Sequence, residues 1–421
     1  MAVIPFKGIL YNPEKVDATL TMAPPYDIVS HGLKDDLYKR SAHNIIRIDF
    51  GKDRDGDNEH ENRYTRAAAY LNDWLKQEIL TQDDEQCFYC YEISYTIDGT
   101  EKKTRGFLGA VKIEELGKGR VHPHEMTYSK PKSDRLNILR YCNANTSPIF
   151  SLYSSEDKIA SSILEHIIGL TPFLEFVYED GCTHRLWRIS DNSQIASIEK
   201  EMADRDVFIA DGHHRYETAL AFKKEMEGKG LCKTGEEPFN YVLMFLSNME
   251  EEGLTLLPTH RIIEVDSEIR IRETLKLHFD LTKISSEDMS GELAIENMLE
   301  TMHSKTHCFG MYLTDTGNYY TLTLKGASLD ADLPECLKKL DVSVLHNFIF
   351  ENLLKVDHYD YEMDPAVAVE RAMQGSFEAV FFLNPTLIRE LKEVALAGHR
   401  MPPKSTYFYP KLLTGIAIYK F

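Results

Sequence analysis

The chain of 421 residues is predicted to fold as an α+β protein, with a large mixed sheet followed by a smaller C-terminal α/β sandwich. A chain of this length is too long for a single hydrophobic core of ordinary size. Its 43% hydrophobic residues are enough to form more than one core. Runs with a period of two residues dominate the first part, and an alternation of helix and strand restarts after Val265. We therefore expect two domains, residues 1–265 and 266–421.

Apolar runs bounded by turn residues predict the strands of the first domain. These strands are expected at residues 3–10, 45–50, 88–97, 104–113, 147–153, 173–178, 184–189, 207–210, 241–247 and 255–263. Asp98-Gly99 separates two of them and predicts a tight hairpin. Helical spacing predicts helices over 63–79, 155–168 and 191–202, and another that begins near Ser133, whose hydroxyl is suited to an N-cap.

The second domain is predicted from the same two periods. Helices are expected at 269–278, 294–303, 340–354, 365–373 and 385–397, and strands at 281–284, 308–314, 319–324, 379–383 and 413–419. The last strand and helices could close back onto the sandwich. No internal repeat or low-complexity linker interrupts this order.

The charge and composition exclude several classes of function. A net charge of −19 opposes general binding to nucleic acid, because an acidic surface repels phosphate. No helix-turn-helix followed by a basic patch is recognised. The sequence begins without a signal-peptide pattern and has no window of membrane-spanning length, so a cytoplasmic protein is expected. The seven scattered cysteines are typical of reduced core residues.

The segment from Val207 to Leu220 is the most informative one. A short apolar run stops at Asp211-Gly212, and helical spacing resumes near His213, His214 and Arg215, which predicts a strand, a tight turn and a helix. Free N–H groups at a helix start and a guanidinium attract phosphate or carboxylate. The alternative is a solvated turn in which Arg215 pairs with Glu217 or another carboxylate.

A second candidate segment contains His122, His124 and Glu125 on a loop interrupted by proline. These groups can bind a divalent metal or exchange protons near neutral pH. The spacing matches no recognised zinc arrangement, so an ordinary surface loop is the alternative.

Cationic groups gather at three further places, Lys130 to Arg135, His260-Arg261 and Lys404 with Lys411. In the last of these, two prolines precede Lys404, Ser405 and Thr406, which offer one charge and two hydroxyls to a phosphate. The prolines are expected to stiffen an exposed loop. Each group has a structural alternative, namely pairing with a carboxylate or a plain connection between two elements.

Asp211-Gly-His-His-Arg215, after a strand and at the start of a helix, resembles the phosphate-binding box of the ParB/sulfiredoxin superfamily, which includes nucleotide-dependent free serine kinases. The wider chain resembles domain-of-unknown-function family 1015, a bacterial family without assigned activity. Segments at 22–27, 122–127, 210–217, 258–261 and 401–406 carry that resemblance. It implies a ParB/sulfiredoxin-like fold with inserted hairpins for the first domain.

The resemblance implies a small-molecule phosphotransferase, a nucleotide-dependent kinase or phosphatase that acts on a hydroxy amino acid such as serine, with ATP or ADP and Mg²⁺ as cofactors. His213, His214 and Arg215 would contact phosphate oxygens, and Asp211 or Glu217 would bind magnesium or orient the ligand. Glu125, with His124 beside it, is the expected base. We expect the His122, Lys130 and Lys404 segments to share the cleft of Arg215. The alternative function is nucleotide sensing without catalysis.

Overall fold

The computed structural model describes residues 1–126, 129–266, 269–284, 289–326, 333–356 and 358–421. Contacts divide the chain into two compact units. Unit 1 contains residues 1–123, 127–255 and 410–421, and unit 2 contains residues 124–126 and 256–409. This division differs from the predicted one in two ways. The boundary follows residue 255 rather than Val265, and residues 410–421 belong to unit 1 rather than to the C-terminal domain.

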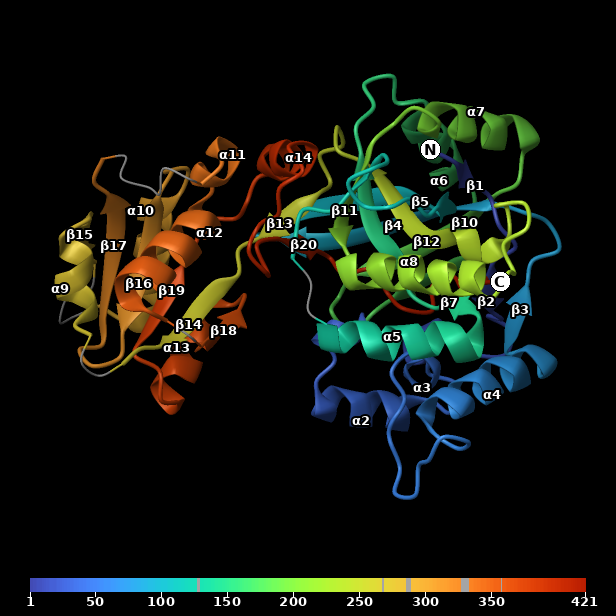
Figure 1. Cartoon of the computed structure of the whole chain (residues 1–421), viewed down its shortest axis with the longest axis horizontal. Helices are drawn as coiled ribbons and strands as arrows, with labels where there is room; N and C mark the ends of the chain where they lie inside the picture. The colour runs from blue at the N-terminus through green and yellow to red at the C-terminus, as the bar shows by residue number, and fades with distance from the viewer. Residues whose placement is uncertain (127–128, 267–268, 285–288, 327–332, 357) are drawn as a thin grey trace. The chain divides into compact units, whose positions relative to one another are not determined.

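Unit 1 contains a nine-stranded mixed sheet (Figure 1). Its order is β6-β11-β8-β12-β5-β4-β10-β9, and β1 pairs with β5. The strands are β1 (Val3–Ile4), β4 (Phe88–Ile97), β5 (Thr100–Lys112), β6 (Val121–His122), β8 (Ile149–Tyr153), β9 (Leu174–Val177), β10 (Thr183–Ile189), β11 (Val207–Asp211) and β12 (Tyr241–Asn248). Two pairs are parallel, β6 with β11 and β8 with β12. The predicted hairpin at Asp98-Gly99 is confirmed by the pairing of β4 with β5.

Helices flank this sheet and fill the segments between its strands. They are α1 (Ala18–Thr21), α2 (His31–Arg40), α3 (Ile46–Asp49), α4 (Arg63–Lys76), α5 (Ser129–Cys142), α6 (Ile159–Ile168), α7 (Asn192–Met202) and α8 (His213–Gly228), with short 3₁₀ turns at Tyr26–Ile28 and Pro238–Asn240. Two small sheets complete the unit, β2 (Ile9–Tyr11) with β3 (Leu80–Gln82) and β7 (Ala144–Asn145) with β21 (Tyr419–Lys420).

Unit 2 is built on a six-stranded antiparallel sheet of order β15-β17-β16-β19-β14-β18. Its strands are β14 (His260–Glu264), β15 (Phe279–Lys283), β16 (Cys308–Leu313), β17 (Asn318–Leu324), β18 (His358–Glu362) and β19 (Ala379–Phe382). β13 (Thr255–Leu257) pairs with β20 (Tyr407–Tyr409). The helices are α9 (Ile271–Lys276), α10 (Gly291–Met302), α11 (Glu335–Lys338), α12 (Asp341–Ser343), a π-helix (Val344–Leu354), α13 (Pro365–Gln374) and α14 (Ile388–Leu396).

Each unit has its own apolar core. In unit 1, alternate strand residues such as Val242, Met244 and Leu246 pack with side chains of α6, α7 and α8. This is the burial that period-two strands and amphipathic helices are expected to produce. In unit 2, side chains of α10 and α13 cover the sheet, and Met298 and Ala368 are fully buried there. The predicted mixed α+β architecture is confirmed in this form.

Several sequence predictions were wrong. The single strands predicted at 3–10 and 255–263 are each two strands that belong to different sheets. Residues 45–50 are not a strand, because the side chain of Asn44 donates to Leu20 O and Met22 O and accepts from Ile46 N, which starts the short helix α3. Ser133 is not an N-cap, since α5 already begins at Ser129. The strand predicted at 413–419 is reduced to Tyr419–Lys420, and the strand β18 was not predicted.

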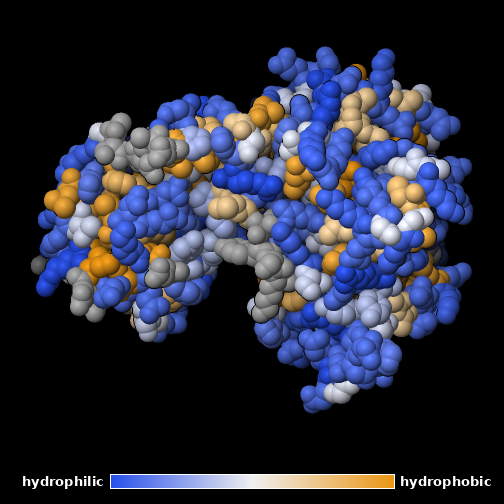
Figure 2. All heavy atoms as spheres, viewed as in Figure 1, coloured by the Kyte–Doolittle hydropathy of each residue, from blue (hydrophilic) through white to orange (hydrophobic). Residues whose placement is uncertain are grey.

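The viewed face of the chain is mostly hydrophilic, and the hydrophobic residues on it are scattered (Figure 2). Among the described residues, no helix is long and apolar enough to cross a membrane.

Candidate functional site

The start of α8 has the geometry that the sequence predicted. β11 ends at Asp211, Gly212 adopts a left-handed φ of 95°, and α8 begins at His213. A Cβ atom at Gly212 would lie 2.8 Å from Nε of Arg215. Glycine therefore serves two purposes here, the left-handed turn and the close approach of a guanidinium to the backbone.

Arg215 folds back over this turn and is nearly buried, with 10% of its side chain exposed. Its Nη1 donates to Ser147 Oγ at 2.7 Å and to Pro148 O, and its Nη2 lies 3.1 Å from Asp211 Oδ2. The Nε of Arg215 is buried and has no hydrogen-bond partner within the described ranges. One donor of the guanidinium is thus left for another acceptor.

The two carboxylates near this turn, Asp211 and Glu217, form ion pairs with lysines that lie far away in the sequence. Asp211 lies 3.5 Å from Nζ of Lys411 as well as beside Arg215. Glu217 forms an ion pair with Lys132 of α5. Of the alternative prediction, a solvated turn with a paired Arg215, the ion pair with Asp211 is present, but Arg215 is nearly buried rather than solvated. The Lys411 ammonium adds a second positive charge there.

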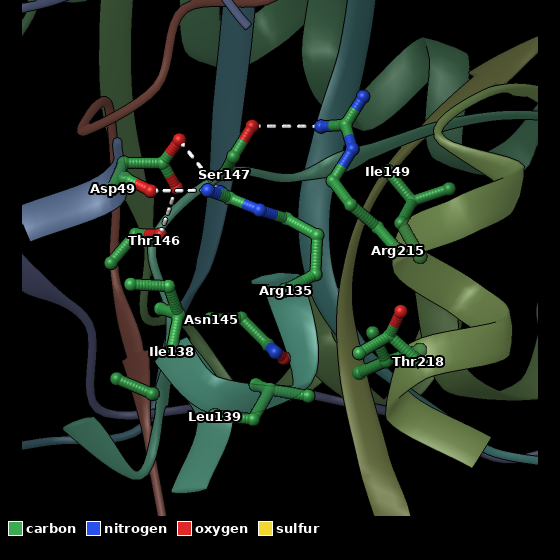
Figure 3. A pocket seen from close by; sticks show the side chains of 12 residues that line it. Asp49, Arg135, Ile138, Leu139, Asn145, Thr146, Ser147, Ile149, Arg215 and Thr218 are labelled. Carbon is green, nitrogen blue, oxygen red and sulfur yellow. Dashed lines mark hydrogen bonds and ion pairs between the residues drawn. The ribbon is translucent and has the colours of Figure 1, made fainter. Parts of the chain in front are cut away.

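A cavity of about 30 Å³ lies beside Arg215 (Figure 3). It has room for roughly one or two water molecules. The wall combines two arginines, one carboxylate, hydroxyls and apolar side chains, from Asp49, Arg135, Ile138, Leu139, Ala144, Asn145, Thr146, Ser147, Ile149, Arg215, Thr218 and Val242. The two guanidiniums come from α5 and α8, which are far apart in the sequence.

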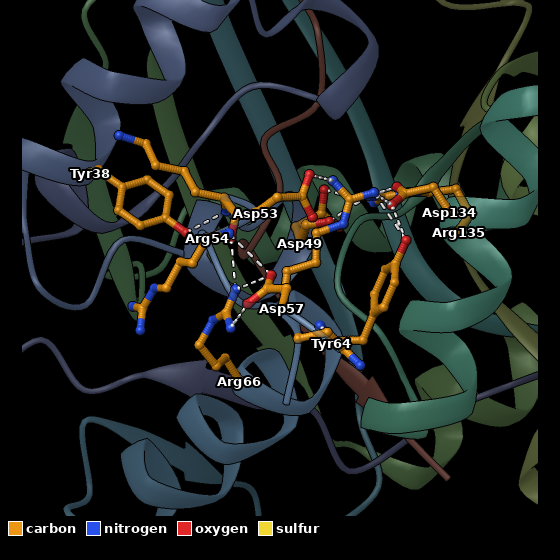
Figure 4. A network of polar contacts seen from close by, with 12 residues as sticks. Tyr38, Asp49, Asp53, Arg54, Asp57, Tyr64, Arg66, Asp134 and Arg135 are labelled. Carbon is orange, nitrogen blue, oxygen red and sulfur yellow. Dashed lines mark hydrogen bonds and ion pairs between the residues drawn. The ribbon is translucent and has the colours of Figure 1, made fainter. Parts of the chain in front are cut away.

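The second arginine of the cavity, Arg135, is held by a buried network (Figure 4). Its Nη1 lies 2.9 Å from Asp49 Oδ2, its Nη2 donates to Asp49 O, and it pairs with Asp134 at 2.6 Å. Thr146 Oγ1 donates to Asp49 Oδ1 at 2.6 Å. Burial alone would lower the pKa of Arg135, but Asp49 and Asp134 outweigh it and raise that pKa.

Tyr26 adds an aromatic ring to the same region. The guanidinium of Arg135 lies 4.2 Å from the centre of this ring, a cation–π contact. Burial raises the pKa of Tyr26 to about 12, although Arg135 and Arg215 both lower it. The sequence analysis named residues 22–27 only as a segment of the family resemblance and did not assign Tyr26 to the site. The proline pair followed by Tyr-Asp was the available signal.

The two histidines of the predicted box differ in exposure. His213 is buried, with 6% of its surface exposed, and His214 is half-buried. His214 O accepts from Thr218 Oγ1 at 2.6 Å inside α8. Their predicted contact with phosphate stays a prediction.

Glu125, His124 and the 401–406 segment come together within unit 2. Glu125 Oε1 accepts from Lys404 N at 2.5 Å, and His124 Nε2 lies 2.9 Å from Thr406 Oγ1. Ser405 Oγ donates to Pro402 O at 2.6 Å. His124, Ser405 and Thr406 are buried, so the expectation of an exposed loop was wrong except at Lys404.

The remaining cationic candidates have structural partners. His122 belongs to unit 1, where its Nε2 lies 2.8 Å from Asp206 Oδ1. Arg261 is buried in β14, and its guanidinium donates to Thr259 O, to Lys404 O at 3.0 Å and to His346 Nε2 at 3.2 Å. The side chain of Lys130 lies outside the described residues. Arg261 therefore supports the backbone from which Lys404 extends.

No group of three or more His, Cys, Asp or Glu side chains among the described residues could hold a metal ion. The carboxylates that the sequence offered for magnesium, Asp211 and Glu217, are each paired with a cation.

A comparison with family models matches residues 3–343 to the family described as a protein of unknown function, DUF1015. The chain belongs to this family. A comparison with curated proteins finds no significant match. The resemblance of residues 211–215 to the ParB/sulfiredoxin box stays a prediction.

Several solved structures are similar to this member of the DUF1015 family. SbnI with a C-terminal truncation, from Staphylococcus aureus, has a TM-score of 0.37 and 10% identity, over 73% of this chain and 85% of that one. A conserved hypothetical protein from Pyrococcus furiosus has a TM-score of 0.33 and 14% identity, over 70% and 89%. A free serine kinase in complex with AMP has a TM-score of 0.32 and 14% identity, over 70% and 92%. At these low scores, the similarity decides neither the fold nor the activity of the chain.

Proposed function

We propose that the chain binds the phosphate of a nucleotide or another phosphate ester beside Arg215, and that it transfers a phosphoryl group to or from a small hydroxylated acceptor such as serine. In this proposal, unit 1 is a ParB/sulfiredoxin-like domain. The observation that carries the proposal is the cavity with two nearly buried guanidiniums, Arg135 and Arg215, the second of which has a donor without a partner among the described residues.

The chemistry of the donors fits an anion better than a neutral ligand. A buried N–H donor without an acceptor costs free energy that a phosphate oxygen would recover. The charge of Arg135 is neutralised by Asp49 and Asp134, and its N–H groups are used in these ion pairs. Arg135 therefore contributes to the electrostatic potential of the cavity rather than direct hydrogen bonds to a ligand. Arg215 is less fully neutralised, because its Nη1 donates to neutral acceptors, Ser147 Oγ and Pro148 O, and only its Nη2 pairs with a carboxylate, Asp211.

The size of the cavity limits what can enter it. A volume of about 30 Å³ accepts an oxygen of a phosphate but no base or sugar. We therefore assign this cavity to the phosphate end of the ligand.

The donor set also bears on magnesium. Mg²⁺ in phosphoryl-transfer sites takes many ligands from phosphates and water and only one or two from protein carboxylates, and when bound it neutralises charge on the phosphates. Asp211 is the carboxylate at the turn, and its ion pairs with Arg215 and Lys411 hold it there. Of the described residues, Asp211 is the best candidate for this contact.

The binding proposal is tested by titrating ADP into the full chain and into Arg215→Ala, by calorimetry. We expect the variant to bind about 1.5–3 kcal/mol more weakly, the range for a lost charged hydrogen bond. Arg205→Ala is the control, because Arg205 forms a surface ion pair with Asp157 in the same unit. Equal affinities in Arg215→Ala and the intact protein would refute the site.

The sequence-based prediction that Glu125 acts as a base does not depend on the cavity beside Arg215 and is tested separately with Glu125→Gln. Following ATP and serine by phosphorus NMR, we expect turnover to fall by about 10²-fold or more while ADP affinity is retained, because glutamine keeps the shape but cannot take a proton. Glu264→Gln, an exposed glutamate of β14, is the control. ADP binding by an intact protein that transfers no phosphoryl group to any hydroxy amino acid would favour nucleotide sensing instead.

A further inference from the structure

A second cavity lies within unit 2, at the end of the sheet where β16 begins and β19 stops. The two strands are antiparallel, and Gly310 pairs with Phe382, so the segments before β16 and after β19 emerge at the same edge. These segments, with the turn between α11 and α12 and the start of α14, enclose about 250 Å³. None of the residues proposed above as phosphate contacts in unit 1 belongs to it.

The walls of this cavity are tied to one another by hydrogen bonds. Asn384 Nδ2 donates to Met302 O and Lys305 O, both at 3.1 Å, and so connects the segment after β19 to the end of α10. Asp341 Oδ1 accepts from His307 N at 2.7 Å and connects the start of α12 to the same turn. The cavity is therefore part of the folded unit rather than a gap between loose loops.

Three cations line the cavity, Lys305, Lys339 and Arg389. Within the part of the chain that the structure describes, none of the three has a hydrogen bond or an ion pair from its side chain. All three side chains are exposed, and their positive charges gather at one cavity although the chain has 67 acidic and only 48 basic side chains. Such a cluster favours an anionic ligand.

Two carboxylates, Asp341 and Glu390, also line the cavity, but both are expected to repel an anion only weakly. Glu390 Oε2 accepts from Leu387 N at 2.8 Å as part of the cap of α14. Burial raises the pKa of Asp341 to about 7, and Glu390 adds to this shift. Asp341 is thus partly protonated at neutral pH, and its protonated oxygen can donate a hydrogen bond to a ligand.

We propose that this cavity, the unit-2 anion pocket, binds a small phosphate monoester through Lys305, Lys339 and Arg389. Its volume is below that of pockets for drug-sized ligands, which begin at roughly 300 Å³, so a ligand of only a few carbon atoms fits. Arg389 lies in the first turn of α14, where the helix dipole also favours negative charge. Arginine and two lysines match a dianionic phosphate better than a single carboxylate.

The test uses the full chain and glycerol 3-phosphate as the probe, with binding measured by calorimetry. The double variant Lys305→Met/Arg389→Met should bind the probe at least about tenfold more weakly, because two charged contacts are lost. Lys283→Met is the matched control, since Lys283 is an exposed lysine of β15 that does not line the pocket. Glycerol 3-phosphate is also a phosphate ester of the kind proposed to bind beside Arg215, so the double variant is measured again in the Arg215→Ala background. The tenfold loss should persist there, which separates this result from the proposed function.

Succinate and the single variant Lys339→Met complete the experiment. Succinate binding as tight as that of glycerol 3-phosphate would overturn the phosphate assignment, and so would the absence of binding to the intact protein. Unchanged affinity in the double variant would overturn the pocket itself. If circular dichroism shows that the double variant is unfolded, Lys339→Met decides the matter, with weaker binding expected and equal binding contradicting the proposal.

Discussion

At the scale of single residues, the turn before α8 depends on the absence of a side chain at Gly212. Gly212→Ala forces an alanine into a left-handed φ of 95° and moves its Cβ into the Arg215 guanidinium. We expect the free energy of unfolding to fall by about 1–2 kcal/mol from the backbone alone, and ADP affinity to fall as Arg215 is displaced. Urea unfolding and calorimetric titration measure the two effects.

Gly230→Ala is the matched control for this variant. Gly230 also has a positive φ, of 72°, but a Cβ there meets no atom within 4 Å. It should therefore lose a similar amount of stability and keep its ADP affinity. A Gly212→Ala protein that binds ADP normally would show that the position of Arg215 does not matter.

At the scale of elements, the spacing of residues in the sequence predicted those helices and strands that are determined by contacts between neighbouring residues. The strand, turn and helix from Val207 to Gly228 were predicted because the turn residues and the apolar period lie in one segment. The helix α3 was not, since the side chain of Asn44 bonds to carbonyls more than twenty residues earlier. The contact of Tyr26 with Arg135 and the pairing of Glu217 with Lys132 likewise join distant segments, which periodicity does not reveal.

In the segment before β20, Thr406 is buried and hydrogen-bonded, whereas Lys404 is exposed to solvent. Thr406→Val removes the hydroxyl beside the fully buried His124, so we expect a loss of about 1–3 kcal/mol in the free energy of unfolding. Lys404→Ala should change that free energy by less than about 0.5 kcal/mol, because Lys404 is exposed. Equal stability of the two variants would contradict this difference between the two side chains.

At the scale of the whole molecule, buried ionisable groups set how stability depends on pH. Burial lowers the pKa of His184, His260 and His346 from the usual 6.5 to about 3. The unfolded chain therefore binds protons at these sites below pH 6.5 that the folded chain does not, and stability is lost as the pH falls. Asp341 acts in the opposite direction, because its pKa is raised from 3.8 to about 7 and the folded chain keeps the proton.

These opposing groups give each unit its own expected slope between pH 5 and 6. In unit 2, two histidines against Asp341 leave one extra proton on the unfolded chain, so stability should rise by about 1.4 kcal/mol per pH unit. In unit 1, His184 predicts a similar slope, and His43, whose pKa is also lowered by burial, adds to it in the same direction. Urea unfolding at both pH values measures them, since both tryptophans, Trp74 and Trp187, lie in unit 1 and their fluorescence reports that unit, while circular dichroism reports both.

Asp341→Asn separates the two contributions in unit 2. Asparagine keeps an acceptor for His307 N but carries no proton that titrates, so the slope of unit 2 should roughly double between pH 5 and 6. Above pH 7 the variant should be more stable than the intact protein, because it avoids an ionised carboxylate next to Glu390 in a buried position. The tryptophan transition of unit 1 should not move, which makes it the internal control. An unchanged slope in the circular dichroism transition would mean that Asp341 titrates normally in the folded chain.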